Sequence, residues 1–138
     1  LLNGPVVLQT TSASGGFHLT DPTRGGNATW DARSGIPGAR GEKGVLYASS
    51  SNHWGDGTTA DNATVAADAH AGLANAWDYF RDVHGRRGAK GDGQGTRVFV
   101  HVRSNWSNAS WVNGEIHLGD GDGINMRPVF NDNLLPIY

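Results

Sequence analysis

One segment of this 138-residue chain, from about residue 60 to residue 84, repeats apolar residues at spacings of three and four. This spacing puts them on one face of an α-helix, so the segment predicts a single long amphipathic helix. Thr59, Asp61 or Asn62 can cap its start, and Gly85 can supply the left-handed residue that follows its end. The repeating residues are Val65, Ala69, Leu73, Ala76, Trp77 and Phe80, of which Trp77 and Phe80 are expected to face a core.

The rest of the chain is rich in short β-prone segments separated by turn-forming residues. Before the helix these segments are VVLQT, GFHL, ATW and GVLYAS, which favour a meandering antiparallel sheet. After the helix, TRVFVHVR alternates with Val98, Val100 and Val102 on one face, which predicts a half-buried strand. The expected fold class is α+β, a β-rich antiparallel lobe with one long helix (about 60–84), and residues 1–138 are expected to form a single domain.

The dipeptide Asn113-Gly114 joins two further β-prone segments, ASWV and EIHL. Because Asn-Gly accepts the positive φ angles of a type I′ turn, Trp111–Val112 and Glu115–Leu118 are predicted to pair as a hairpin. If the first strand lies at a sheet edge, its backbone N–H and C=O groups can pair with an extended peptide. The hairpin pattern alone does not decide whether the strand binds one.

Charge and composition argue against several functions. The net charge of −2 and the pI of about 6.3 provide no broad attraction for nucleic acid. No apolar run reaches the roughly 20 residues needed to span a bilayer, so no membrane partner is expected. The chain has no cysteine, which excludes a disulfide framework and a thiolate metal site.

The six histidines form no zinc motif, because no two of them lie four residues apart. No zinc ligand and no catalytic residue are therefore predicted within this chain. Asp120 and Asp122, in GDGDG, offer hard oxygen ligands to a calcium ion. The same loop can instead be held by hydrogen bonds from the aspartates to the backbone, so a calcium site and a structural loop both stay open.

Four segments, in the same order and at similar spacing, resemble the N-terminal half of the catalytic domain of thermolysin-like zinc metallopeptidases. They are GGFHLTDPTRG, SSSNHWGDGTTADNATVAADAH, WDYFRDVHGR, and NASWVNG followed by GDGDG. Together they extend from about Gly16 to Pro128. Each segment is a weak signal by itself, whereas their ordered combination is specific.

The resemblance implies a role for the predicted hairpin. In that family the N-terminal half is a β-rich lobe with one long helix, and its edge strand lines the active-site cleft. By the same motif, Asn108 and Ala109 would bind the substrate backbone and Trp111 would flank the cleft. Ser110 stands where the family usually has a larger aromatic residue, which leaves the shape of the adjacent subsite open.

The resemblance also implies a secreted zinc metalloendopeptidase that acts on extended peptides or proteins. Its zinc ligands and general base would belong to an H-E-x-x-H helix, and this motif is absent from the 138 residues. The C-terminal helical zinc-binding lobe is therefore expected to be absent from this chain and to be its partner. The chain alone is expected to be inactive, and calcium is a second candidate cofactor.

Two alternatives remain open. The first is a non-catalytic lobe that binds peptides or a partner protein through the same edge strand. The second is a glycan-binding module that uses Trp30, Trp54, Trp106 and Trp111 as aromatic platforms. Zinc content and peptide cleavage separate the peptidase hypothesis from both alternatives.

Overall fold

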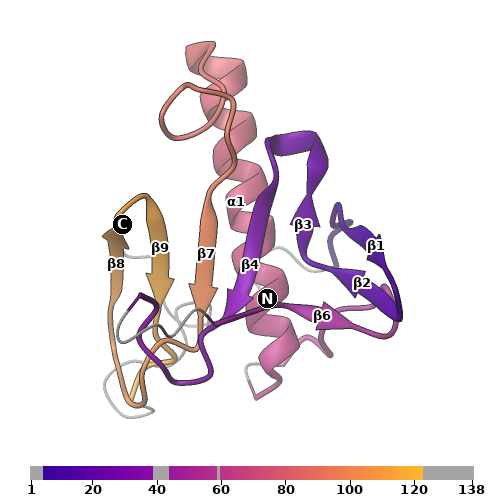
Figure 1. Cartoon of the computed structure of the whole chain (residues 1–138), viewed down its shortest axis with the longest axis vertical. Coiled ribbons are helices and arrows are strands. Elements are labelled where there is room, and N and C mark those ends of the chain that lie inside the picture. Colours follow the sequence, from indigo (N-terminus) through magenta and orange to yellow (C-terminus); the bar gives the residue numbers. More distant parts are fainter. Residues whose placement is uncertain (1–4, 39–43, 59, 123–138) are drawn as a thin grey trace.

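The computed structural model describes residues 5–38, 44–58 and 60–122. These residues form two β-sheets and one long helix (Figure 1), which confirms the predicted α+β class. In chain order the elements are β1 (Thr11–Ala13), β2 (Gly16–His18), β3 (Thr20–Asp21), η1 (Pro22–Arg24), β4 (Asn27–Asp31), β5 (Val45–Leu46), β6 (Ala48–Ser49), α1 (Asn62–His84), β7 (Arg97–Val100), β8 (Ala109–Val112) and β9 (Glu115–Leu118).

The larger sheet has the strand order β3-β4-β7-β9-β8, with β5 paired to β4 outside this row. β4, β7 and β9 run parallel to one another, so the prediction of an antiparallel sheet is wrong for the centre of the molecule. The connections explain the difference. α1 returns the chain between β4 and β7, and β8 returns it between β7 and β9, so the three central strands point the same way (Figure 1).

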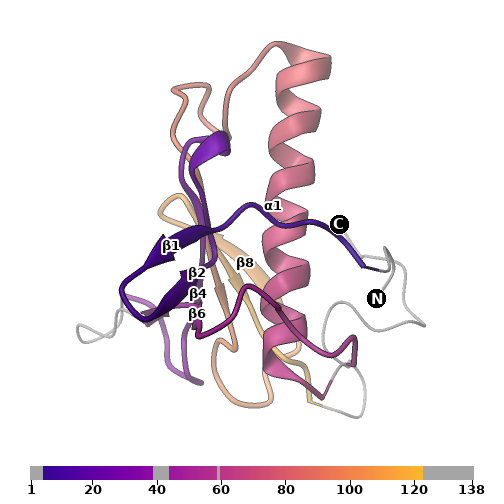
Figure 2. The same ribbon diagram turned by 90° about the vertical axis from the view of Figure 1, so that its right-hand side faces the viewer.

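The smaller sheet, β1-β2-β6, is antiparallel as predicted. The first expected strand, VVLQT, is not formed, because residues 6–10 pair with no other strand among the described residues. Residues 5–10, called the N-terminal segment from here on, instead run across α1 (Figure 2). The Gln9 carbonyl lies 3.0 Å from Nε2 of His70, which attaches this segment to the helix.

Local rules predict both ends of α1 correctly. The carboxylate of Asp61 accepts hydrogen bonds from the N–H groups of Ala63 and Thr64, so Asp61 is the cap among the three candidates. Gly85 follows the helix in the left-handed conformation, with a φ of 61°. No helix in the described part of the chain combines the length and hydrophobicity needed to cross a membrane.

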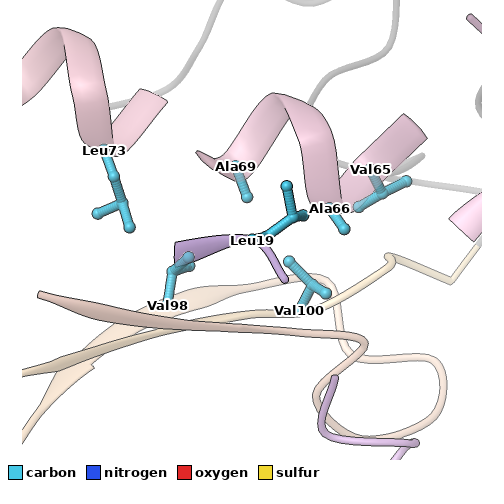
Figure 3. Packing of buried hydrophobic residues seen from close by; sticks show 7 residues of the cluster. All are labelled: Leu19, Val65, Ala66, Ala69, Leu73, Val98 and Val100. Atoms are coloured by element: carbon cyan, nitrogen blue, oxygen red, sulfur yellow. The ribbon is translucent and has the colours of Figure 1, made fainter. Parts of the chain in front are cut away.

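The main core lies between α1 and one face of the larger sheet (Figure 3). It is formed by Leu19, Val65, Ala66, Ala69, Leu73, Val98 and Val100. Ala66 and Ala69 contribute small side chains to the helix side of this core. Trp77 is buried as predicted, whereas Phe80 is only half-buried and Ala76 is exposed.

β7 is buried on both faces, so the prediction of a half-buried strand is wrong. Val98 and Val100 belong to the main core, and Phe99 packs on the opposite face of the sheet with Val102. The strand ends at Val100 because His101 has a positive φ of 55°, which interrupts the alternation of faces. Val102 therefore does not share the face of Val98 and Val100.

Candidate functional site

β8 and β9 form the hairpin that the sequence predicts. The turn residues Asn113 and Gly114 have φ angles of 52° and 85°, as a type I′ turn requires. β8 begins at Ala109, two residues before the predicted start at Trp111. Ala109 is therefore part of the paired strand.

β8 lies at the edge of the larger sheet, as expected for a strand that binds peptides (Figure 1). It pairs with β9 on one side, and no strand among the described residues pairs with its other side. An edge strand presents backbone donors and acceptors to any extended chain that approaches it. The open side of β8 is therefore the candidate site.

The register of the hairpin shows which residues of β8 face the open side. The N–H of Gly119 donates to the carbonyl of Asn108 at 3.0 Å, so Asn108 directs its carbonyl toward β9. Backbone groups alternate along an antiparallel ladder, so Ala109 and Trp111 direct their N–H and C=O groups away from β9. These two residues supply the backbone groups of the open edge.

The Asn108 side chain already contacts this edge. Its Oδ1 accepts a hydrogen bond from the N–H of Ala109 at 2.8 Å. The alternation leaves the carbonyl of Ala109 and both backbone groups of Trp111 for an incoming chain. Asn108 is exposed at the start of this row, so its amide N–H groups can reach the same chain.

Trp111 lies beside the open edge and is 54% exposed. It pairs with Ile116, whose side chain packs against the main core, so Trp111 lies on the α1 side of the sheet. Ser110 lies on the opposite side together with its partner His117. A bound peptide would therefore meet a large aromatic ring on one side of β8 and a small hydroxyl on the other.

The loop between β7 and β8 has a constrained backbone. Positive φ angles occur at three non-glycine residues of this loop, His101, Arg103 and Asn105. The N–H of Val102 donates to the carbonyl of Leu118 at 3.0 Å, and the N–H of Gly121 donates to the carbonyl of Trp106 at 3.2 Å. These bonds attach the loop to β9 and to the chain that follows β9. They therefore fix the position of the loop that leads into β8.

Asp120 contacts a buried histidine that directly follows β7. Nδ1 of the buried His101 lies 2.8 Å and 2.9 Å from the two carboxylate oxygens of Asp120. Burial lowers the pKa of His101, but the hydrogen bond to Asp120 and its charge outweigh burial, so the pKa is raised. The pair is 19 residues apart in sequence, and no local spacing indicates it.

This contact favours the structural-loop interpretation of GDGDG, although the bond runs to a side chain rather than to the backbone. Asp122 is half-buried in the same loop. Across residues 5–38, 44–58 and 60–122, no three His, Asp or Glu side chains lie where they could share a metal ion. These residues therefore do not fit a zinc site, and calcium at Asp120 and Asp122 stays a prediction.

The four tryptophans of the glycan hypothesis do not form a shared exposed platform. Trp111 is the one with a largely exposed side chain, and the other three are half-buried. Trp30 contacts Phe99, Trp54 contacts Tyr47, and the guanidinium of Arg103 lies over Trp106. The geometry therefore favours peptide binding at β8 over sugar stacking.

The chain is similar in sequence to known metalloproteases. A family model described as the catalytic domain of thermolysin metallopeptidase matches residues 1–133. The transglutaminase-activating metalloprotease of Streptomyces mobaraensis is 38% identical over 129 residues, which cover 92% of this chain and 16% of that protein. A bacillolysin of Brevibacillus brevis is 36% identical over 124 residues, covering 88% of this chain and 21% of that protein.

A thermolysin of Alicyclobacillus acidocaldarius is 33% identical over 133 residues, covering 93% of this chain and 22% of that protein. The chain thus spans less than a quarter of the length of these relatives. Among solved structures, the precursor of protealysin, a metalloproteinase from Serratia proteamaculans, is similar with a TM-score of 0.54 and 20% identity. That match covers 70% of this chain and 27% of the other, and it supports the fold alone.

Proposed function

The chain belongs to the thermolysin metallopeptidase family, and from this premise we propose that it is the N-terminal lobe of a secreted zinc metalloendopeptidase, whose edge strand holds the substrate. The observation that carries the proposal is the open side of β8, where Ala109 and Trp111 direct their backbone groups away from β9. An extended peptide can add to such an edge as a further strand. This mode recognises backbone and therefore suits an enzyme that cleaves many sequences.

Three residues have separate roles in this proposal. The carbonyl of Ala109 accepts a hydrogen bond from a peptide N–H, and the backbone of Trp111 continues the ladder. The side-chain amide of Asn108 reaches a peptide carbonyl at the start of the row. The indole of Trp111, on the α1 side of the sheet, contacts a substrate side chain.

Catalysis is assigned to a partner lobe outside these residues. The described residues do not fit a zinc site, and the 138 residues contain no H-E-x-x-H motif. Zinc would polarise the scissile carbonyl and activate a water molecule when held by that lobe. The contribution of this chain is to fix the peptide backbone, which lowers the entropic cost of reaching the transition state.

The backbone N–H of Trp111 can be tested by comparing two substitutions in the full-length peptidase. Trp111→Ala removes the indole and keeps the N–H, whereas Trp111→Pro removes both. Because this N–H points away from β9, proline there breaks no bond of the β8–β9 ladder. We expect Trp111→Pro to lower kcat/KM about fivefold to tenfold below Trp111→Ala, which corresponds to one lost hydrogen bond.

Equal kcat/KM values for the two variants, with circular dichroism showing that both are folded, would contradict strand addition at β8. Zinc analysis and peptide cleavage by the same protein separate this proposal from a non-catalytic peptide-binding lobe. A protein that binds extended peptides at β8 without zinc or cleavage would support that alternative. Secretion is part of the proposal and is tested by locating the protein in culture medium.

A further inference from the structure

One end of the proposed peptide-binding edge lies next to a lysine. The loop between α1 and β7, residues 85–96, lies at the same end of the larger sheet as the β8–β9 turn (Figure 1). Lys90 of this loop reaches the turn, because a Cβ added to Gly114 would lie 3.3 Å from its Nζ and 3.5 Å from its Cε. The proposed function assigns Lys90 no role.

The loop that carries Lys90 is held in place by backbone hydrogen bonds. The N–H of Gly93 donates to the carbonyl of Arg87 at 2.9 Å, and the N–H of Gly95 donates to the carbonyl of Gly25 at 2.8 Å. The first bond closes the loop on itself, and the second attaches it to the chain between η1 and β4. The backbone at Lys90 is therefore supported, and only the flexible side chain has to be ordered when it binds a ligand.

The ammonium group of Lys90 has no carboxylate partner among the residues that the structure describes. Lys90 is exposed and takes part in none of their ion pairs. Two nearby acidic residues already have partners. Glu115, directly after the turn, pairs with Arg97, and the carboxylate of Asp92 accepts a hydrogen bond from the N–H of Gln94 at 2.9 Å. Lys90 therefore presents a positive charge beside the turn that no described carboxylate neutralises.

A peptide on the open side of β8 would approach Lys90 at one position. Such a peptide lies about 4.8 Å from β8, and its residues advance by about 3.3 Å each. The peptide residue past Trp111 lies beside Asn113, the neighbour of Gly114. Its side chain comes within about 10 Å of the ammonium, which is the screening length at moderate salt. A residue beside Asn108 lies about 17 Å farther along the strand, beyond this range.

We propose that Lys90 makes the peptidase prefer substrates with an aspartate or glutamate side chain beside Asn113, at the turn end of β8. This inference rests on the proposed function and adds a side-chain preference to the recognition of backbone. The ammonium attracts a carboxylate at that position and repels a basic side chain. Because both charges are exposed, the preference should be modest and should weaken as salt is added.

The preference can be measured with peptides whose two ends are blocked, so that one side chain carries the only carboxylate. An aspartate is moved one position at a time along an otherwise neutral sequence, and each peptide is compared with the one that has asparagine at the same place. In the full-length peptidase, kcat/KM should favour aspartate by about threefold to fivefold at a single position toward one end of the peptide. The difference should disappear in about 1 M salt, where the screening length is about 3 Å.

Three substitutions test whether the preference comes from Lys90. Lys90→Glu should reverse it, so that a peptide with lysine at this position is cleaved faster than one with aspartate, whereas Lys90→Arg should retain it. Arg87→Glu is the matched control, because it makes the same change of charge in the same loop, but its side chain is not among the atoms nearest Gly114. This control should keep the preference for aspartate. Circular dichroism shows whether each variant is folded.

The proposal would be overturned by equal cleavage of aspartate and asparagine peptides at every position. An unchanged preference in Lys90→Glu would also overturn it, as would an equal reversal in Arg87→Glu. Failure of the proposed function appears instead with the neutral peptide, as absent cleavage or as equal kcat/KM for Trp111→Pro and Trp111→Ala. If the protein binds these peptides without cleaving them, fluorescence anisotropy gives Kd ratios that should show the same reversal in Lys90→Glu.

Discussion

A hydrogen bond between Nδ1 of His101 and the carboxylate of Asp120 joins the end of β7 to the loop after β9. His101 is buried, whereas the side chain of Asp120 is 40% exposed. The bond therefore connects the interior of the sheet to the surface. Since the chain between these residues contains β8, the pair closes a loop around the proposed binding strand.

The raised pKa of His101 predicts a specific pH dependence of stability. The stabilisation from the bond between His101 and Asp120 is fully present below pH 6.5, the ordinary pKa of histidine. It is lost as pH rises through the higher pKa that His101 has in the folded protein. Asp120→Asn removes the charged partner of His101, so below pH 6.5 the free energy of unfolding should be lower by about 1 kcal/mol. It should then no longer fall as pH rises. The effect is small because Asp120 is partly screened by water. Urea unfolding below and above pH 6.5 measures this, with Asp92→Asn as an exposed control. A pH profile like that of the unsubstituted protein would contradict the assignment.

His70 should produce the opposite pH dependence. Its Nε2–H donates to the carbonyl of Gln9, so Nδ1 accepts from the hydroxyl of Thr29, and the ring is neutral. Burial lowers the pKa of His70, so this group costs stability as pH falls below 6.5, where the unfolded chain binds the proton more strongly. His70→Gln should reduce the loss of stability in acid. Thermal unfolding below and above pH 6.5 checks this, and the exposed His53→Gln variant should behave like the unsubstituted protein.

Arg24 holds a buried carboxylate to the surface of α1. Its guanidinium lies 2.7 Å from Asp21, which is 1% exposed, and 2.7 Å from Asp78 on the helix. Arg24→Ala would leave Asp21 buried with only its bonds to Thr23, so we expect a loss of about 2–3 kcal/mol in the free energy of unfolding.

The control for Arg24 is Arg81→Ala, which removes the more exposed partner of Asp78. Surface ion pairs contribute little, so this variant should lose less than about 1 kcal/mol. Chemical denaturation of both variants gives the comparison. Equal losses would show that burial of Asp21 does not determine the effect.

Asn108→Ala should weaken substrate turnover in the full-length peptidase. Loss of the amide removes a substrate contact and releases the N–H of Ala109, so we expect a cost of roughly 1–3 kcal/mol in transition-state stabilisation. kcat/KM measured with several unrelated peptides tests this, because a backbone contact should matter for all of them. Asn75→Ala, on the exposed face of α1, is the matched control. An unchanged kcat/KM for Asn108→Ala would remove this residue from the binding wall.

Gly119→Ala should displace the loop that precedes β8. A Cβ at this position would overlap the backbone carbonyl of Trp106, which cannot move without moving the loop. We expect lower stability and lower kcat/KM together. Gly72→Ala is the control, because a Cβ there meets no neighbour and alanine should stabilise the helix by about 0.5–1 kcal/mol.

Features that depend on neighbouring residues could be predicted from the sequence. The ends of α1 follow from a capping carboxylate at Asp61 and a left-handed residue at Gly85. The hairpin follows from Asn113-Gly114, because these two residues determine the turn type and the turn determines the register. The position of β8 at an edge was predicted conditionally from the hairpin and by the family resemblance.

Features that depend on distant parts of the chain could not be predicted in this way. The parallel pairing of β4 with β7 requires knowing where α1 packs, which periodicity does not reveal. VVLQT has the composition of a strand, yet Gln9 bonds to a helix side chain instead of to a strand. His101 and Asp120 meet because the sheet brings the ends of β7 and β9 together.

The parallel pairing at the centre of the sheet has a consequence for folding kinetics. Asn27 and Thr96, joined by a hydrogen bond at the start of this pairing, are 69 residues apart, so a long loop must close before β7 finds its place. α1 and the β8–β9 hairpin contain only local contacts and can form earlier. β9 pairs with β7 between residues that are only 18 apart, such as Arg97 and Glu115, so this pairing closes a much shorter loop. We therefore expect the pairing of β4 with β7 to be the slow step of folding, so that the β8–β9 hairpin, although it can form early, joins a complete core only late.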